Sequence, residues 1–370
     1  MSLLAGLLIG LSVGLTMGLY SGLRIGLRMG NYSGPDNNIF SIGYGALQIA
    51  YSDKKTFEKL VKEVAMYGRK SNTKVVFDTA RVYGDCEQML GGILEANPEL
   101  RQYLFIVVKI GIAFDTDHPH YLKKSDLESM AHESLKRLRL PKVDCIMLHR
   151  LPGNHPDFDE ALSTLIGFRD TLCDTVGLSE VSGKTIQVAD IDCIEIAYSP
   201  FVRTADYNSV MELAKKKNCM ILTYTSIARG LLNDTVLNFF DENREFKTEF
   251  DGLTTDEFQN KVFELLFVSQ SEQSIGYYDP DVLKNNIRII ANFIYYCKDH
   301  QWDPSQVCLA YAVKCGCIPI PGTTKVENLK KNMDAPTVSI TDDNITEINA
   351  ITAGFKGDPN PTSLSYLNSV

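Results

Sequence analysis

The sequence predicts a single (β/α)8 barrel, or TIM barrel, of the α/β class, preceded by a hydrophobic N-terminal extension. Short apolar segments alternate with amphipathic segments eight times along the chain. A strict strand-then-helix order implies a parallel sheet, and eight such units close most naturally into a barrel. A doubly wound sheet is the alternative, but the G-x-G-x-x-G motif that usually follows its first strand is missing from this sequence. We therefore expect the barrel.

The overall composition is that of a globular protein. Of its 370 residues, 44% are hydrophobic and 22% are charged. The 46 acidic and 37 basic residues give a formal charge of −9, and an acidic surface repels phosphate backbones, so we expect no nucleic-acid partner. The nine cysteines form no repeated CxxC pairs. We therefore expect reduced thiols, no metal site and a cytoplasmic location.

Residues 1–34 differ from the rest of the chain and are treated as a separate extension. No charged residue occurs from Leu3 to Leu23, and Arg24 and Arg28 follow. A segment of this length can span a bilayer as a helix, and a repeated GxxxG pattern lets two such helices approach closely. One interpretation is a membrane anchor over residues 3–23 that holds the barrel in the cytosol. The glycines recur at every fourth position: Gly6, Gly10, Gly14, Gly18, Gly22, Gly26 and Gly30.

Three other interpretations of this extension stay open. Arginine without any acidic residue before Asp36 also fits a cleaved organelle presequence. The repeat could be translated repetitive DNA without structural consequence, or translation could begin at Met17 or Met29. In each case the extension lies outside the catalytic fold. Residues 31–38 are rich in turn formers and predict a linker into the barrel domain, which we assign to residues 35–370.

The expected strands are short and mostly rich in Val and Ile, as strands buried on both faces are. In order, they are residues 42–47, 75–77, 104–108, 143–148, 176–178, 193–197, 220–223 and 317–320. The helices between them are predicted from amphipathic patterns. They are residues 54–67, 86–96, 125–138, 158–172, 182–188, 207–217, 282–298 and 326–332.

Residues 234–280 interrupt this alternation after the seventh strand with a polar segment that contains aromatic residues. A loop this long is uncommon in a compact domain and is often functional. It is either a lid over substrate or cofactor, or a surface excursion with its own short helix at residues 256–266.

Ionisable residues follow three consecutive strands. The second strand stops at Asp78 and the loop after it carries Tyr83, the third stops at Lys109, and the fourth stops at His149. Each residue alone has a structural explanation, as a cap, a solvated charge, a core histidine or a packing tyrosine. Their coincidence at equivalent strand ends indicates an active site, because chemistry in a (β/α)8 barrel takes place at the carboxyl ends of the strands.

These four residue types can together reduce a carbonyl group. A free phenol with a pKa near 10 is a poor acid at neutral pH, and a nearby ammonium lowers that pKa. Lys109 can supply this charge, Asp78 can balance Lys109, and His149 can orient a substrate carbonyl. Tyr83 would then act as general acid while hydride reaches the carbon.

The segment around Tyr83 resembles a signature of the aldo-keto reductases. Residues 78–91, DTARVYGDCEQMLG, match the pattern D-T-A-x-x-Y-G-x-[SC]-E-x-x-L-G, and Lys109 and His149 complete the family's Asp, Tyr, Lys, His tetrad. The resemblance covers residues 39–354. It implies an NADP-dependent oxidoreductase that reduces a small aldehyde or ketone to the alcohol.

The resemblance also implies a set of cofactor-binding residues. Ser179 would contact the nicotinamide amide, as would Glu195, which stands where the family usually has Gln. Tyr224 matches the aromatic residue that stacks on the nicotinamide ring, and Ser226 lies in the same segment. A helix start near the C-terminus resembles the site for the adenosine 2′-phosphate, since helix N-termini favour anions. It carries Gly322, Thr323, Thr324, Lys325, Asn328 and Asn332, with Asn328 where the family usually has Arg. The implied cofactor is NADPH/NADP.

Within the family, residues 177–182, Glu195 and residues 319–322 are similar to fungal pyridoxal reductases, which implies reduction of pyridoxal to pyridoxine. In the loop after the third strand, His118, His120 and Tyr121 either contact an aromatic aldehyde or are surface residues. A different function also stays open. Some members resemble NADPH-binding, redox-sensing regulatory subunits of membrane proteins, with little turnover, and the hydrophobic extension fits this alternative.

Overall fold

The computed structural model describes residues 38–113, 120–203, 205–232, 236–237, 253–266 and 275–358. The predicted extension at residues 1–34, with its candidate anchor at residues 3–23, lies outside them. In the described part of the chain, no helix is both long and apolar enough to cross a membrane.

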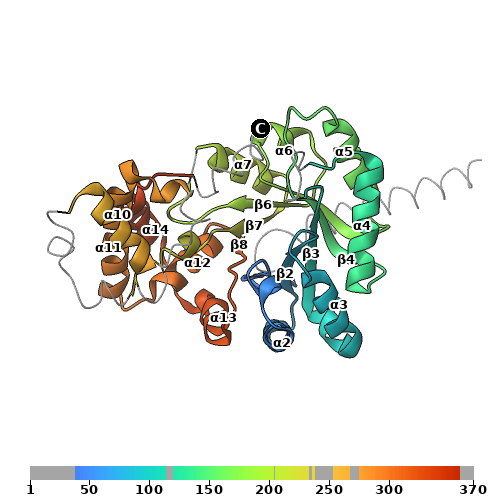
Figure 1. The fold of residues 1–370 in the computed structure, drawn as a ribbon, viewed down its shortest axis with the longest axis horizontal. Coiled ribbons are helices and arrows are strands. Elements are labelled where there is room, and N and C mark those ends of the chain that lie inside the picture. Colours follow the sequence, from blue (N-terminus) through green and yellow to red (C-terminus); the bar gives the residue numbers. More distant parts are fainter. Residues whose placement is uncertain are drawn as a thin grey trace, which may run out of the picture.

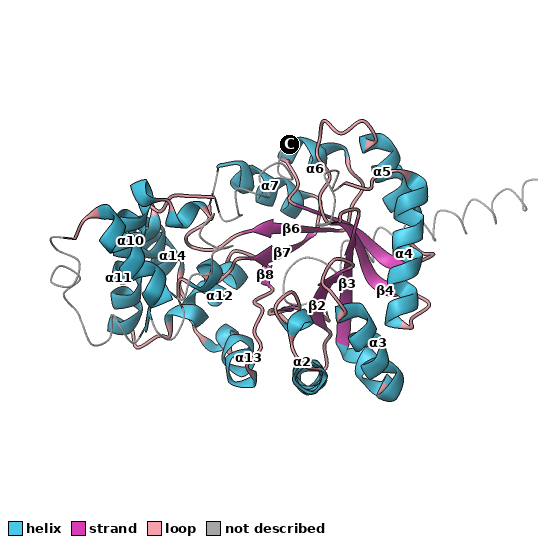
Figure 2. Ribbon diagram, viewed as in Figure 1, coloured by secondary structure: helices cyan, strands magenta, loops and turns pink. Residues whose placement is uncertain are grey.

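Eight parallel strands form one sheet in the order of the sequence, from β1 to β8, which confirms the predicted (β/α)8 barrel (Figures 1 and 2). The strands are β1 (Tyr44–Gly45), β2 (Val75–Ala80), β3 (Leu104–Ile110), β4 (Val143–Leu148), β5 (Cys173–Ser179), β6 (Cys193–Ala197), β7 (Met220–Tyr224) and β8 (Ile318–Pro319). Each was expected, although β1 and β8 are shorter than predicted.

The first and last strands meet through backbone contacts. The Gly43 N–H donates to the Pro319 carbonyl at 2.8 Å, and the Gly45 N–H donates to the Pro321 carbonyl at 3.4 Å. A Cβ atom at Gly45 would lie only 2.6 Å from the Ile320 carbonyl oxygen. Glycine at this position therefore lets the two strands approach closely enough to bring the ends of the sheet together.

Helices surround the sheet (Figure 2). They are α2 (Lys54–Ser71), α3 (Cys86–Ala96), α4 (Lys124–Leu138), α5 (Phe158–Gly167), α6 (Gly183–Val188), α7 (Ala205–Lys216), α10 (Thr255–Leu266), α11 (Pro280–Asp299), α12 (Pro304–Lys314), α13 (Val326–Met333) and α14 (Asp342–Thr352). Short 3-10 turns are η1 (Ile49–Tyr51), η2 (Pro98–Tyr103), η3 (Ala228–Gly230), η5 (Gly276–Tyr278) and η6 (Ala335–Thr337).

Two hydrophobic cores follow from the alternation of side chains along each strand. Val75 and Phe77 of β2 pack in the larger core between the sheet and the helices, whereas Val76 points into the barrel. The interior core consists of Val76, Phe105, Val107, Cys145, Met147, Cys193, Met220, Leu222 and Ile320. The same alternation carries the polar residues nearer the carboxyl ends of these strands into the barrel interior.

The region after β7 differs from the prediction. Residues 282–298 were expected to provide the barrel helix here, but α12 packs against β8, and α11 packs with α10 and α14 beyond it (Figure 1). Helix α12 was not expected, because buried residues cover most of its circumference and leave no amphipathic pattern. Helix α14 was not expected either, and only its Ile348 and Thr352 are buried.

The predicted insertion after β7 contains a described helix. The short helix expected at residues 256–266 is confirmed by α10. Most of the rest of the predicted insertion lies outside the described residues, so the lid stays a prediction.

The helix predicted over residues 158–172 ends five residues early, at Gly167. There the Phe168 carbonyl accepts from the N–H groups of Leu172 and Cys173 and turns the chain into β5.

Candidate active site

Asp78, Lys109 and His149 all project into the barrel interior at the carboxyl ends of β2, β3 and β4. Asp78 and Lys109 were predicted to end their strands, and this was wrong. Both residues lie inside them. The parallel ladder continues through both, pairing Asp78 with Val107 and Ala80 with Lys109. Polar side chains do not end these strands, because backbone pairing is unaffected by a side chain that points inward. His149 directly follows β4, and its backbone N–H donates to the Ile110 carbonyl at 2.8 Å.

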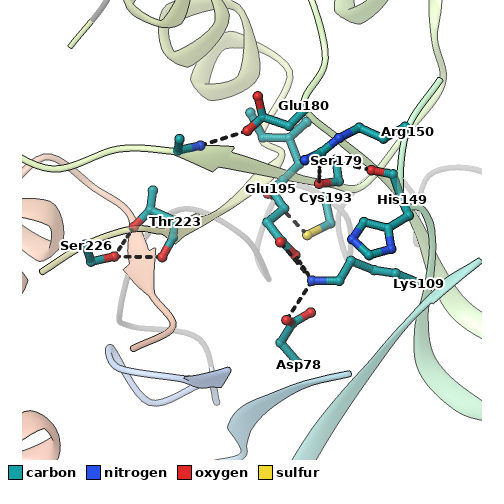
Figure 3. Close-up of polar contacts among 12 residues, drawn as sticks. Asp78, Lys109, His149, Arg150, Ser179, Glu180, Cys193, Glu195, Thr223 and Ser226 are labelled. Atoms are coloured by element: carbon teal, nitrogen blue, oxygen red, sulfur yellow. Dashed lines mark hydrogen bonds and ion pairs between the residues drawn. The ribbon is translucent and has the colours of Figure 1, made fainter. Parts of the chain in front are cut away.

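The Lys109 ammonium occupies the centre of the site, between two carboxylates (Figure 3). Its Nζ atom lies 2.7 Å from Asp78 Oδ2, and 2.8 and 3.0 Å from the two carboxylate oxygens of Glu195 on β6. The Lys109 side chain is 1% exposed and both carboxylates are 4% exposed. A charge in such surroundings is tolerated only because it is paired and hydrogen-bonded.

A tight turn places Tyr83 over this ion pair. The Tyr83 N–H donates to the Ala80 carbonyl at 2.9 Å, and Gly84 adopts a left-handed φ of 50°. Lys109 Nζ lies 5.3 Å from the centroid of the Tyr83 ring. The His149 ring meets the Tyr83 ring edge to face, with 5.8 Å between centroids. The structure thus brings together all four residues of the predicted tetrad.

The charges of Lys109 and Asp78 depend on each other. Burial opposes the charge of Lys109, but Asp78 and Glu195, with Tyr83, raise the pKa of Lys109 well above its ordinary value. Burial and the neighbouring Glu195 raise the pKa of Asp78 well above its usual range, against the lowering effect of Lys109. Lys109 is therefore firmly cationic, whereas Asp78 binds a proton more readily than an exposed aspartate.

Tyr83 and His149 are both held in their neutral forms. Burial raises the pKa of Tyr83, and the lowering effect of Lys109 is opposed by Asp78 and Glu195. The net direction is opposite to the prediction from sequence, which considered Lys109 but neither burial nor the second carboxylate. Burial, Lys109 and Arg150 lower the pKa of His149 well below its ordinary value. A neutral imidazole carries one N–H, so His149 can act as a hydrogen-bond donor without being charged.

Two residues in the site were not assigned from sequence. Arg150 is 8% exposed, and its Nη1 donates to Ser179 Oγ at 3.2 Å and to the His149 carbonyl at 3.1 Å. Glu180, directly after β5, has a left-handed φ of 54°, and its carboxylate accepts from the Ala197 N–H at 3.0 Å. The signal available in the sequence was a charged residue within two positions of the end of a buried strand, Arg150 after β4 and Glu180 after β5.

The residues predicted to contact a nicotinamide lie on or just after β5, β6 and β7. Ser179 is the last residue of β5, and Tyr224 is the last residue of β7, with the Arg229 guanidinium 6.0 Å from its ring centroid. Ser226 is buried, and its hydroxyl donates to the Thr223 carbonyl at 2.8 Å. Glu195 lies in the middle of β6, where Lys109 donates to both of its oxygens, and its contact with the nicotinamide stays a prediction.

The predicted phosphate site lies between β8 and α13. A Cβ atom at Gly322 would lie 2.8 Å from the Gly45 carbonyl, so the loop follows the β1 backbone closely. Thr323 Oγ1 accepts from the Lys325 N–H at 3.1 Å, and Thr324 is exposed. Lys325 is the N-cap of α13, whose first turn receives no side-chain cap from the described residues. The first-turn N–H groups are therefore available to an anion, which fits a cofactor phosphate.

The remaining predicted residues have mixed outcomes. Asn328 lies in the first turn of α13, partly exposed, and Asn332 is buried near the end of the helix. His118 lies outside the described residues. His120 is partly buried, with its ring 5.7 Å from that of His155, and burial, His155 and Arg150 lower its pKa. The Tyr121 N–H donates to the Gly111 carbonyl at 2.9 Å.

Comparisons with known proteins agree with this fold. The family model described as "Aldo/keto reductase family" matches residues 41–353. Among curated relatives, aldo-keto reductase str7 of Strobilurus tenacellus is 25% identical over 74% of this chain and 75% of its own length. The probable pyridoxal reductase 2 of Schizosaccharomyces pombe is 27% identical over 83% of this chain and 89% of its own length.

A solved structure supports the same architecture. Glycerol dehydrogenase AKR11B4 from Gluconobacter oxydans superposes with a TM-score of 0.63 at 19% identity, over 87% of this chain and 93% of that chain. Together with the family match over most of the sequence, the barrel and its signature segment identify the protein at the family level. The chain belongs to the aldo/keto reductase family and is an oxidoreductase of the NAD(P)H-dependent, carbonyl-reducing type.

Proposed function

We propose that this protein reduces a small aldehyde or ketone to the alcohol with NADPH, and that Tyr83 is the general acid. The observation that carries the proposal is the buried group formed by Tyr83, Lys109 and Asp78 beside a neutral His149. A protonated phenol, a fixed ammonium and an uncharged N–H donor are what the reduction of a carbonyl group needs in a water-poor site.

Each residue has a role that follows from its charge state. His149 donates its N–H to the substrate oxygen and orients the carbonyl. A bound NADPH supplies the hydride that reaches the carbonyl carbon. As the oxygen gains negative charge, it becomes more basic than a phenolate and takes the proton from Tyr83. The Lys109 ammonium then stabilises the phenolate left on Tyr83, and Asp78 holds Lys109 in place.

The predicted cofactor residues support NADPH rather than NADH. Ser179, Tyr224 and Ser226 would hold the nicotinamide end at the carboxyl ends of β5 and β7. The loop that carries Gly322, Thr323 and Thr324 would hold the phosphate end, together with Lys325, Asn328 and Asn332. The uncapped first turn of α13 and the positive charge of Lys325 both favour a 2′-phosphate.

Pyridoxal is our proposed substrate, with pyridoxine as the product. The support is the 27% identity to a probable pyridoxal reductase and the similarity of residues 177–182 and 319–322 to that group. The test is a turnover screen of the purified full chain with NADPH and a panel of carbonyl compounds. Pyridoxal should be reduced with the highest kcat/KM, and a better aliphatic or sugar substrate would overturn this assignment.

The role of Tyr83 is tested by Tyr83→Phe, which removes only the hydroxyl. We expect kcat to fall by roughly 10²- to 10⁴-fold, the usual contribution of a general acid. The Kd for NADPH, followed by cofactor fluorescence, should change less than about threefold, because the ring still packs beside His149. Tyr67→Phe is the matched control, because the Tyr67 hydroxyl contacts Asp334 on the outside of the barrel, at 3.3 Å.

Two outcomes would contradict the proposal. Full activity in Tyr83→Phe would mean that another group donates the proton. Tight NADPH binding without turnover of any carbonyl compound would favour the redox-sensing regulatory subunit instead.

A further inference from the structure

Glu195 occupies a position that the proposed mechanism does not use. Both of its oxygens lie within 3.0 Å of Lys109 Nζ, opposite Asp78 at 2.7 Å. Strands β2 and β6 are not neighbours in the sheet, so the two carboxylates reach Lys109 from separate walls of the barrel (Figure 3). Glu195 is therefore a second counter-ion of Lys109.

The charges in this cluster do not balance. One ammonium faces two carboxylates, and all three side chains are almost fully buried. Two carboxylates that share one buried site cannot both ionise without a large cost, so one of them retains a proton. Asp78 Oδ1 has no hydrogen-bond partner among the described residues, which leaves one carboxyl oxygen available for that proton. Burial and the charge of Glu195 favour the protonated form of Asp78 and raise its pKa well above the usual range.

Among the residues that the structure describes, no other group near the cluster supplies the missing positive charge. The described ionisable side chains around this cluster, apart from Lys109, are Tyr83, Cys86, Arg150, Cys193 and His149, and burial, Lys109 and Arg150 keep His149 neutral. Burial raises the pKa values of Tyr83, Cys86 and Cys193, so these groups stay neutral. Arg150 is cationic but interacts more strongly with Glu180 than with Glu195. Its charge is thus matched elsewhere.

We propose that Asp78 and Glu195 form a carboxyl dyad that holds one proton at neutral pH, and that Glu195 is a positioning residue acting on Tyr83 through Lys109. The functional part of this inference rests on the proposed role of Tyr83. When the dyad loses its proton at higher pH, a second negative charge beside Lys109 opposes ionisation of the phenol. Tyr83 therefore stays protonated, and able to donate, further into the alkaline range.

Infrared spectroscopy of the cofactor-free protein tests the dyad directly. At pH 7 the wild type should show the C=O stretch of a protonated carboxyl group. This band should disappear in Glu195→Gln and also in Asp78→Asn, because either change leaves one carboxylate balanced by Lys109. A band that persists in both single variants would overturn the proposal.

The matched control for this measurement is Glu87→Gln. Glu87 is a buried carboxyl on α3, 3.5 Å from Arg137, and burial also raises its pKa. Its replacement must leave the dyad band in place. If Glu195→Gln does not fold, Glu195→Asp should retain the band and Asp78→Asn should lose it, so the measurement still decides the question.

Kinetics test the effect on Tyr83. In Glu195→Gln, the alkaline limb of kcat for carbonyl reduction should move about one pH unit lower, because one negative charge is lost near the phenol. The Kd for NADPH should stay within about twofold of the wild type. An unmoved limb with NADPH binding weakened tenfold would overturn the proposal and make Glu195 a cofactor contact. The infrared result needs no turnover, so it stands even if Tyr83→Phe shows that the proposed acid is wrong.

Discussion

The two ends of the barrel treat buried carboxylates in opposite ways. At the amino end, Asp144 of β4 is 2% exposed and contacts both Lys74 and Arg101, the latter at 2.8 Å. It also accepts from the Ile106 N–H at 2.8 Å. Asp192, just before β6, accepts from the Val176 N–H at 3.0 Å and pairs with Arg169 at 2.9 Å. Each of these acids is matched by at least one cation and by a backbone donor.

At the carboxyl end, by contrast, Asp78 and Glu195 share the single ammonium of Lys109, and Asp78 Oδ1 has no partner among the described residues. Satisfied ion pairs fix strands in place, whereas mismatched ones shift protonation states. The amino end of this barrel is therefore built for stability and the carboxyl end for proton chemistry, as in other barrels of this type.

The largest expected contrast is between Asp144→Ala and Asp78→Asn. Removing Asp144 leaves the Ile106 N–H without its acceptor and the partly exposed Lys74 and Arg101 without their shared partner, so the free energy of unfolding should fall by about 1–3 kcal/mol. Asp78→Asn removes a carboxyl that its surroundings disfavour in the charged form, so the free energy of unfolding at pH 7 should not fall and is expected to rise. Urea titration at pH 7 measures both.

Activity should separate the same two variants in the reverse order. Folded Asp144→Ala should keep kcat within about twofold of the wild type, and Asp78→Asn should lose most of it. If Asp78→Asn were the less stable variant, or if Asp144→Ala lost turnover while folded, the distinction between the two ends would fail.

A second prediction concerns the pH dependence of stability. The pKa of Asp78 is raised in the folded state, so the folded protein binds more protons than the unfolded chain above about pH 4, the ordinary aspartate value. The stability linked to this group is fully present below that pH and is lost as the pH rises through the folded pKa. Asp78→Asn should remove this decline, which urea titrations at a series of pH values between 4 and 8 will show. Parallel profiles for wild type and variant would contradict the raised pKa.

The smallest expected effect concerns the start of α13, and it tests whether the functional end of the barrel extends to this helix. Lys325→Met removes one positive charge at the proposed phosphate site, so the preference for NADPH over NADH in kcat/KM should fall about tenfold, equivalent to about 1.4 kcal/mol. Lys330→Met is the control, because Lys330 lies on the same helix and pairs with Glu63 at 3.5 Å. An equal effect of the two changes would argue against a phosphate contact at Lys325.

Much of the site could be predicted from spacing along the chain. Asp78, Tyr83, Lys109 and His149 follow buried apolar segments, and parallel strands bring such positions to one end of the sheet. The location of Glu195 against Lys109 could not be predicted, since the resemblance placed it on the nicotinamide. Contact between β2, β3 and β6 depends on the closure of the barrel, which no local pattern encodes. Helix α12 was not predicted for a related reason. Burial on most sides removes the hydrophobic periodicity that marks a surface helix.

The sequence by itself determined the order of strands and helices, the family and the identity of four residues that meet in the site. These features depend on local patterns of polarity and on one signature segment. Only the tertiary structure decided the protonation of that site. Burial and the second carboxylate raise the pKa of Tyr83, although Lys109 alone would lower it. A pKa depends on every charge and on the solvent within a few ångströms, and those neighbours come from strands far apart in the chain.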